Sequence, residues 1–407
     1  MEINTRHLTE LIRMERFEDV YTRHRRKELG CAEAADLLGC SARHFLRLRK
    51  SYEADGLEAL RDGRVGRASP HRAPDAEVAM ISRLYEERYR GMSVAHFHDY
   101  AVRKHGLKRS YNWTRQTLAR GGHVKPSRRG GPHRLRRPRK PMCGMMIHQD
   151  GSRHEWVPGQ WWDLIVTMDD ATSEILSAFF VAEEGTASTF RGLAEVIGSH
   201  GLFCSLYSDR GSHYFHTPAA GGKVDKGRLT QVGRALKQLN IRHIPAYAPQ
   251  ARGRSERVFG TLQDRLVKEL ALEGITDMNA ANDYLRTVYV PEHNRKFAVK
   301  PEEETSAWVP VIGLNIRDVL CIQEERTVQN DNTVRYGGHV LQIPKTAHRH
   351  HYVRAKVQVN TYPDGTMALF YGPLCIAEYE PDGSIRKPET ETDDEKAAGK
   401  KERKRAV

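Results

Sequence analysis

The chain has 407 residues, 39% of them hydrophobic and 29% charged, with a net charge of +13. This length is enough to bury cores in roughly three domains. With no run of about 18 apolar residues and no apolar leader, we expect an intracellular protein without a membrane partner. Six scattered cysteines without a CxxC pair predict neither a disulfide framework nor a cysteine zinc site.

The positive charge is concentrated at the front of the chain. Residues 1–140 hold 32 Lys and Arg against 17 Asp and Glu, whereas residues 141–407 have a net charge of −2. Lys and Arg that neutralise phosphates release counterions, which drives binding to a polyanion. The composition therefore predicts a nucleic-acid partner for the front part, and a merely solvated basic surface is the alternative.

Residues 1–60 are predicted to form a helix-turn-helix domain. The helix formers at 32–38 precede a Gly-Cys turn and then a basic helix that Ser41 can cap. In such a unit the second helix enters the major groove by its N-terminal residues. We expect base contacts through Arg47 and phosphate contacts from Lys50, with an ordinary αα-hairpin as the alternative. The predicted DNA-binding residues are Ser41, Arg43, His44, Arg47 and Lys50.

A second helix-turn-helix or winged-helix-like domain is predicted at 75–122. Ser93 and Ser110 can cap its two helices, and glycines follow each of them. Its predicted DNA-binding residues are Asn112 and Arg115. Residues 123–142 are then predicted to be a basic linker, because 123–140 holds eight Lys and Arg and no acid.

The middle of the chain changes to short apolar runs separated by turns. Strands are predicted at 145–149, 164–168, 175–181, 202–207 and 242–247, and helices at 187–199, 228–239 and from about Arg254. Three antiparallel strands followed by alternating helices and strands is the ribonuclease-H-like α/β order.

Three acids occupy the ends of these predicted elements. Asp150 ends the first strand, Asp209 follows the fourth, and Glu256 begins a helix, so all three should converge at one edge of the sheet. Carboxylate oxygens suit Mg²⁺, and a metal pair can stabilise the attacking and leaving oxygens of phosphodiester chemistry. The sequence therefore predicts a Mg²⁺ site for such chemistry on DNA.

A competing acid pair lies between the second and third predicted strands. Asp169 and Asp170 begin a segment that suits a hairpin turn, which is the main interpretation, and a metal pair is the alternative. Asn at either position is expected to leave most strand cleavage intact.

Basic residues surround Glu256 near the predicted helix start. This end of a helix favours anions, so phosphate contacts are expected there, and helix-start solubility is the alternative. The predicted DNA-binding residues of this segment are Arg252, Arg254 and Arg257.

The back of the chain reads as helices and then short strands. Residues 277–300 look helical, 326–385 are predicted to form a small SH3-like β-barrel with a ProAspGly hairpin, and 386–407 a charged disordered tail.

Several motifs together resemble the integrase-core transposases of the ISNCY group of bacterial insertion sequences. They stand, in order, at 149–156, 207–214, 229–239, 249–257 and 262–270. The resemblance implies a multidomain fold: α-helical helix-turn-helix N-terminal domains, an α/β ribonuclease-H-like integrase core at 143–310, and the SH3-like barrel. It places the catalytic and metal-binding triad on Asp150, Asp209 and Glu256.

The same resemblance implies an activity and its partners. It implies binding to transposon terminal inverted repeats, 3′-end cleavage, and strand transfer into double-stranded target DNA by a homodimer or higher multimer. It also implies two Mg²⁺ ions, for which Mn²⁺ can substitute, and a cytoplasmic, nucleoid-associated location.

One departure from the wider integrase superfamily lies between the second and third acids. The 46 residues from Asp209 to Glu256 exceed the commoner spacing, and the excess maps to the Gly-rich loop 217–227. The ISNCY group resembles this chain in having that loop. A DNA-binding regulator derived from a transposase and a ribonuclease-H-type nuclease without joining activity are the rival functions.

Overall fold

The computed structural model describes residues 5–61, 72–125, 137–218, 222–225, 227–247, 253–345 and 349–386. Arg252 and the predicted charged tail beyond 386 lie outside the described residues. The chain divides into two compact units, Met1–Arg88 with Gln116–His123, and Tyr89–Arg115 with Val124–Val407. No helix in the described ranges is long and apolar enough to span a membrane.

The first unit begins with three helices around a small core. A long first helix, absent from the sequence prediction, places Phe17 and Val20 against the buried Phe45 of the third helix. The Phe17 and Phe45 rings lie 6.1 Å apart. The elements of this unit are α1 (Thr5–Arg25), α2 (Cys31–Leu37), α3 (Ala42–Asp55), η1 (Gly56–Leu60) and α4 (Asp75–Arg88).

The helix-turn-helix connection forms as the sequence predicts. Residues 38–41 join α2 to α3, and Gly39 adopts a φ of 66°, a left-handed conformation that glycine tolerates best. The Ser41 hydroxyl then accepts a hydrogen bond from the His44 backbone N–H, which caps α3.

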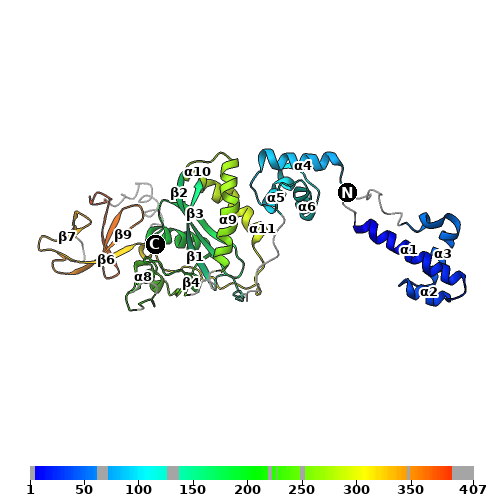
Figure 1. The fold of residues 1–407 in the computed structure, drawn as a ribbon. Coiled ribbons are helices and arrows are strands. Elements are labelled where there is room, and N and C mark those ends of the chain that lie inside the picture. The colour runs from blue at the N-terminus through cyan, green and yellow to red at the C-terminus, as the bar shows by residue number, and fades with distance from the viewer. Residues whose placement is uncertain are drawn as a thin grey trace, which may run out of the picture. The chain divides into compact units, whose positions relative to one another are not determined.

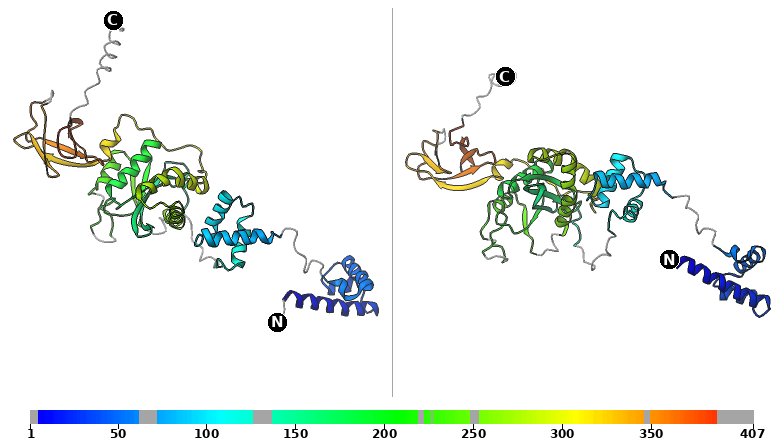
Figure 2. Two further views of the ribbon diagram at one scale, coloured as in Figure 1. Left: turned by 90° about the horizontal axis from the view of Figure 1, so that it is seen from above. Right: turned by 45° about the horizontal axis from the view of Figure 1, so that its top comes forward.

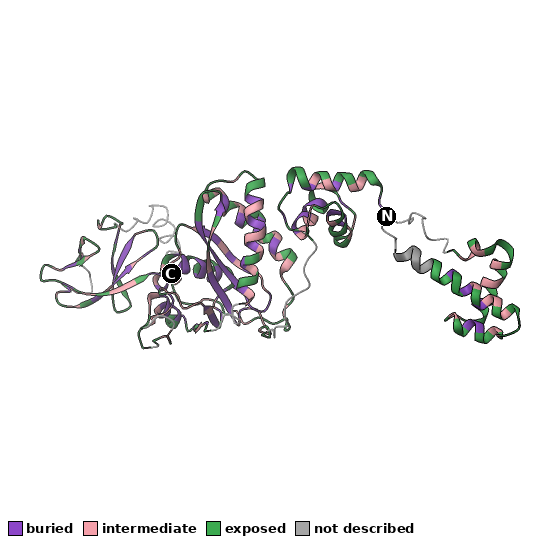
Figure 3. Ribbon diagram, in the orientation of Figure 1, coloured by how far each residue is buried: buried purple, intermediate pink, exposed green. Residues whose placement is uncertain are grey.

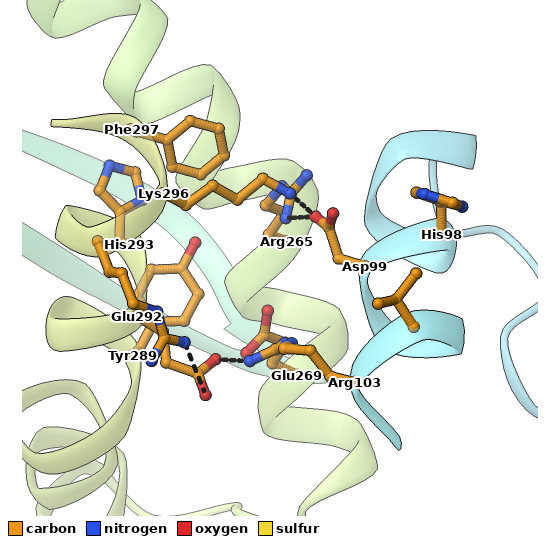
Figure 4. A pocket seen from close by; sticks show the side chains of 12 residues that line it. His98, Asp99, Arg103, Arg265, Glu269, Tyr289, Glu292, His293, Lys296 and Phe297 are labelled. Atoms are coloured by element: carbon orange, nitrogen blue, oxygen red, sulfur yellow. Dashed lines mark hydrogen bonds and ion pairs between the residues drawn. The ribbon is translucent and has the colours of Figure 1, made fainter. Parts of the chain in front are cut away.

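The second unit contains α5 (Val94–His105), which packs on the helices that carry Arg265 and Lys296 (Figure 4). Asp99 pairs with Arg265 and Lys296, and Arg103 pairs with Glu292. These ion pairs fix α5 to two helices that follow the sheet. Ser93 does not cap α5 as predicted, because its hydroxyl instead donates to Asp264, 2.7 Å away. Ser110 does cap α6 (Tyr111–Arg120), accepting from the Trp113 backbone N–H.

A five-stranded mixed sheet forms the centre of this unit (Figure 1). Its order is β3-β2-β1-β4-β5, with antiparallel pairing among the first three strands and parallel pairing from β1 to β4 and from β4 to β5. This confirms the predicted mixed α/β sheet, in which three antiparallel strands precede alternating helices and strands. The strands are β1 (Ile147–Val157), β2 (Gln160–Asp169), β3 (Ile175–Val181), β4 (Ser205–Ser208) and β5 (Arg242–Pro245).

Helices cover both faces of the sheet and bury two separate cores. Leu206 belongs to the core shared with α7 and α8, whereas Val166 belongs to the core shared with α9 and the helices after it. In both views of Figure 2, α9 lies beside the strands, and Figure 3 shows the strands largely buried while α9 carries both buried and exposed residues. The helices are α7 (Thr186–His200), α8 (Gln231–Gln238), α9 (Gly253–Leu272), α10 (Met278–Tyr284), η3 (Leu285–Tyr289) and α11 (Val290–Phe297).

The C-terminal strands form two sheets around their own core. Among the described residues these are a four-stranded sheet, β11-β10-β9-β6, and a separate β7–β8 hairpin. The edge strands β6 and β11 do not pair with each other in this sheet, so the predicted closed SH3-like barrel is not observed. The elements are α12 (Ile316–Val319), β6 (Ile322–Thr327), β7 (Thr333–Tyr336), β8 (His339–Gln342), β9 (Lys356–Thr361), β10 (Met367–Tyr371) and β11 (Leu374–Tyr379).

Candidate active site

The first of the predicted acids lies on β1 and the second directly follows the neighbouring strand β4. In the parallel β1–β4 pair, Ile147 lies opposite Leu206 and His148 opposite Tyr207. Asp150 follows His148 by two residues on β1, and Asp209 directly follows Ser208, the last residue of β4. Both acids therefore belong to this strand pair, and the negative charge of each raises the pKa of the buried Tyr214.

Hydrogen bonds fix the turn that carries Asp209. The Gly211 backbone N–H donates to the Asp209 carboxylate at 2.8 Å. Farther along the turn, the buried Tyr214 hydroxyl donates to the Gln149 side-chain oxygen on β1 at 3.1 Å. Burial raises the pKa of Tyr214, and the negative charges of Glu184, Asp150 and Asp209 raise it further. The turn is thus held to the strand that carries the first acid.

Glu184 is a carboxylate near this site that the sequence analysis did not identify. A Cβ at Gly151 would collide with the Glu184 carboxylate, so the glycine after Asp150 leaves room for it. Glu184 also lies 3.5 Å from the Nε2 atom of His213. No local pattern in the sequence indicates this proximity, because Glu184 follows β3 and its neighbours come from β1 and the Asp209 turn.

Helix α9 lies along the face of β1 that carries Asp150. His148, Asp150 and Ser152 alternate along β1 and so share one face. The Gln263 side chain of α9 donates to the Ser152 hydroxyl at 3.0 Å. At the start of α9, Arg254 reaches Asp170, which also binds His148. Glu256 follows Arg254 by two residues, so it begins the helix at the end nearer His148.

The three predicted acids are not gathered into one coordination sphere. Glu256 is exposed in the first turn of α9, whereas Asp150 is buried. In the described part of the chain, no group of three or more His, Cys, Asp or Glu side chains is arranged to hold a metal ion. Asp150 and Asp209 thus belong to one strand pair, whereas Glu256 lies on a separate helix.

Asp169 and Asp170 form the β2–β3 turn, which confirms the main interpretation of this pair. One Asp169 oxygen accepts from the backbone N–H groups of Ala171 and Thr172, and the other accepts from Gly144. One Asp170 oxygen accepts from three side chains, and the other from the Lys140 backbone N–H at 2.8 Å. Because protein donors already occupy these oxygens, the alternative of a metal pair loses its support.

A half-buried histidine supports the end of β4. His243 on β5 lies 2.9 Å from the Ser208 hydroxyl, directly before Asp209. Burial lowers the pKa of His243 to about 3, and the neighbouring His213 contributes. Burial and the nearby Arg265 similarly lower the pKa of His293, on α11, to about 4. Both imidazoles are therefore neutral in the folded protein at neutral pH.

These two histidines predict that acid destabilises the second unit. In the unfolded chain a histidine takes up a proton as the pH falls through about 6.5. In the folded protein His243 and His293 remain unprotonated until far lower pH. Protonation therefore favours the unfolded state, and the stability present above about pH 6.5 is lost below it. Each should lower the free energy of unfolding by about 2 kcal/mol between about pH 7 and pH 5. Urea unfolding followed by tryptophan fluorescence measures this, since all five Trp residues lie in this unit.

Single substitutions test the two histidines separately. His243→Gln and His293→Gln should each reduce the pH dependence, and the exposed His351→Asn should leave it unchanged. An equal pH dependence in all four proteins would contradict the assignment.

The first helix-turn-helix unit exposes most of its predicted DNA-binding residues. Arg43, Arg47 and Lys50 are exposed on α3, while His44 is half-buried and lies 2.8 Å from the Arg47 guanidinium. Ser41 is exposed and already caps the helix. The cations thus remain available along one helix.

The other predicted DNA-binding residues differ in their surroundings. Asn112, Arg115 and Arg257 are exposed. Arg254, in contrast, is largely buried, and its guanidinium binds Asp170 and the Arg137 carbonyl. A phosphate contact by Arg254 stays a prediction that would compete with these bonds.

Comparison with known proteins gives one family model and several solved structures. A winged helix-turn helix model matches residues 23–79. A chain of the simian T-cell lymphotropic virus intasome in complex with PP2A regulatory subunit B56 gamma is 13% identical, with a TM-score of 0.32, over 76% of this chain and 99% of that one. The HTLV-2 integrase catalytic core domain in complex with magnesium is 15% identical, with a TM-score of 0.27, over 35% of this chain and 82% of that one. These scores are too low to establish a shared fold.

Two relatives that match most of this chain are more informative. The transposase for insertion sequence IS1202 of Streptococcus pneumoniae is 28% identical over 346 residues, which cover 76% of this chain and 73% of that protein. The putative transposase y4bF of Sinorhizobium fredii (strain NBRC 101917 / NGR234) is 31% identical over 338 residues, 82% of this chain and 73% of the relative. Since this identity extends across most of both proteins, the chain belongs to the family of insertion-sequence transposases.

Proposed function

We propose that this protein is a DDE transposase that cuts the ends of its element and joins them to target DNA. The observation that carries this proposal is the parallel β1–β4 pair, on which Asp150 and Asp209 would face each other, with Glu256 on the helix α9 that covers this sheet. Membership of the transposase family supports it. The resemblance of the motifs to the ISNCY group remains part of the proposal.

The donor chemistry of these residues fits Mg²⁺, with Mn²⁺ as a substitute. Carboxylate oxygens are the ligands this ion prefers, and Asp150 and Asp209 would supply them from adjacent strands, with Glu256 joining from α9. Two bound ions would stabilise negative charge on the attacking and leaving oxygens. The side chains would therefore orient and hold the metal ions, and none is needed as a covalent nucleophile.

The proposed reaction has two steps that use the same residues. In the first, water attacks the phosphorus at the end of the element, and the bond to the 3′ oxygen breaks, which leaves a free 3′-hydroxyl. In the second, this hydroxyl attacks a target phosphodiester, forming one bond and releasing another 3′-hydroxyl. Asp150 and Asp209 would position both phosphates in turn.

The front of the chain would select the DNA ends. The exposed cations of α3 suit a duplex, and base contacts are proposed for Arg43, His44 and Arg47, with Lys50 on a phosphate. Asn112, Arg115, Arg252, Arg254 and Arg257 are proposed as further DNA contacts. A homodimer or larger multimer would hold two ends together, and the C-terminal strands are proposed as an SH3-like module of that assembly.

An end-cleavage assay tests the proposed function. The full chain is incubated with Mg²⁺, labelled duplex carrying the inverted repeat that flanks its gene, and a target plasmid. New 3′-hydroxyl ends and joined products are expected. Binding without cleavage would instead indicate a regulator, and cleavage without joining would indicate a nuclease.

A further inference from the structure

A single buried carboxylate connects three separate segments of the second unit. Asp170 is completely buried, yet it accepts hydrogen bonds from the His148 imidazole at 2.7 Å and from the Arg137 and Arg254 guanidinium groups. A buried charge is tolerated only when it is paired and hydrogen-bonded. Burial raises the pKa of Asp170, but the bonds from His148, Arg254 and the Lys140 backbone lower it more, so the carboxyl stays ionised.

Two partners of Asp170 lie two residues in sequence from proposed metal-binding acids. His148 precedes Asp150 by two residues on the same face of β1, and Arg254 precedes Glu256 by two residues in the first turn of α9. Asp170 therefore ties the strand that carries one acid to the helix that carries another. No other described residue is shown bonded to both of these partners.

The end of the basic linker completes this connection. Arg254 also donates to the Arg137 carbonyl at 2.8 Å, and Arg139 donates to the Asp170 and Ala171 carbonyls at 3.1 Å. The start of α9 is thus bonded both to the sheet and to residues 137–140. Movement of α9 away from β1 would leave the Asp170 charge without one of its cations.

We propose that Asp170 is a positioning residue that holds the first turn of α9 against β1, so that Glu256 reaches the site of Asp150 and Asp209. The inference rests on the proposed function, because it concerns the same three acids. Asp170 itself binds no metal, since protein donors occupy both of its oxygens. From the sequence alone, Asp170→Asn is expected to leave most cleavage intact. The positioning role instead predicts that this substitution weakens metal binding.

The test compares Mn²⁺ binding by the full chain with two matched variants. Asp170→Asn should weaken Mn²⁺ binding about tenfold, because residues that orient metal ligands typically contribute that much. Glu269→Gln is the control, as Glu269 is also a buried, hydrogen-bonded carboxylate of the second unit, but lies on α9 about 20 Å from Glu256. Electron paramagnetic resonance of free Mn²⁺ measures the affinity without any need for catalysis.

A second variant keeps the test decisive if Asp170→Asn folds poorly. Arg254→Gln removes only the ion pair between α9 and Asp170, and it should also weaken Mn²⁺ binding. The double variant should be no weaker than Asp170→Asn alone, because both changes break the same connection. Thermal unfolding by tryptophan fluorescence reports whether each protein is folded.

The outcomes separate this inference from the proposed function. Weaker Mn²⁺ binding in Asp170→Asn and Arg254→Gln, with Glu269→Gln like wild type, supports the positioning role even if wild type proves unable to cleave DNA. Wild-type affinity in a folded Asp170→Asn or Arg254→Gln protein overturns it, as does a wild-type chain that binds no Mn²⁺. A loss equal to that of the Glu269→Gln control would show a merely structural role and overturn it as well.

Discussion

Replacing any one of the three proposed metal-binding acids is expected to abolish end cleavage and joining. Asp150→Asn, Asp209→Asn and Glu256→Gln each remove a ligand charge while preserving shape. Because phosphoryl transfer with two metals leaves the side chains little to do beyond holding the ions, losing one ligand should cost several kcal/mol, at least about a thousandfold in rate. The loss should appear in Mg²⁺ and in Mn²⁺.

DNA binding should survive in all three variants, and this distinguishes lost chemistry from lost structure. The proposed base-contacting residues lie on α3, in the other unit, so terminal-repeat DNA should still shift in a gel. Asp364→Asn, which alters an exposed carboxylate paired with Arg317, serves as the control and should cleave normally. Full activity in any of the three variants would refute that residue's assignment.

The strands were predictable where their side chains are apolar on the buried face. Residues 175–181 were predicted and form β3 with the same bounds. The first strand was predicted to end at 149, but β1 continues to Val157. Its polar stretch 150–155 lacks a strand pattern, and only backbone pairing with the apolar strand β2 extends it. A strand segment that forms because a neighbouring strand pairs with it need not show a strand pattern in its own sequence.

The N-terminal helix α1 shows a similar limit. Its mean composition is polar, and the residues that it buries, Met14, Phe17 and Val20, form a sparse stripe. The stripe becomes meaningful only because α2 and α3 supply a core against it. The capped helix α3, in contrast, was predicted from the local Gly-Cys-Ser signal.

The candidate site also has a part that the sequence predicts and a part that depends on tertiary packing. The order of elements predicted that Asp150 and Asp209 would meet, and this stays a prediction that the parallel pairing of β1 with β4 allows. The Asp170 connection could not be predicted, because its partners at 137, 148 and 254 are 33, 22 and 84 residues away in sequence. Ion pairs between such distant segments depend on packing, so the sequence indicated a turn residue where the structure adds a tie between β1 and α9.

Binding to the terminal repeat is expected to depend steeply on salt and on the cations of α3. If the protein makes about six to ten phosphate contacts, its affinity should fall by about 10³ to 10⁵ when salt is raised from roughly 50 to 200 mM. The reason is that releasing counterions from DNA is less favourable at higher salt concentration. Fluorescence anisotropy of labelled repeat and random duplexes, titrated with the full chain over this range, measures both the slope and the preference. We expect tighter binding to the repeat throughout.

Two substitutions on the same helix separate base recognition from charge. Arg43→Ala should cost about 1 to 3 kcal/mol and relax the preference at one base position, because Arg43 lies at the N-terminal end of α3. Lys50→Ala, two turns later, should weaken repeat and random DNA alike and reduce the salt slope by about one. Because Arg43 and Lys50 are both exposed cations, the two substitutions remove the same charge and differ in its position on the helix. Equal affinity of the wild-type chain for repeat and random DNA, or an identical response to both substitutions, would remove α3 as the recognition helix.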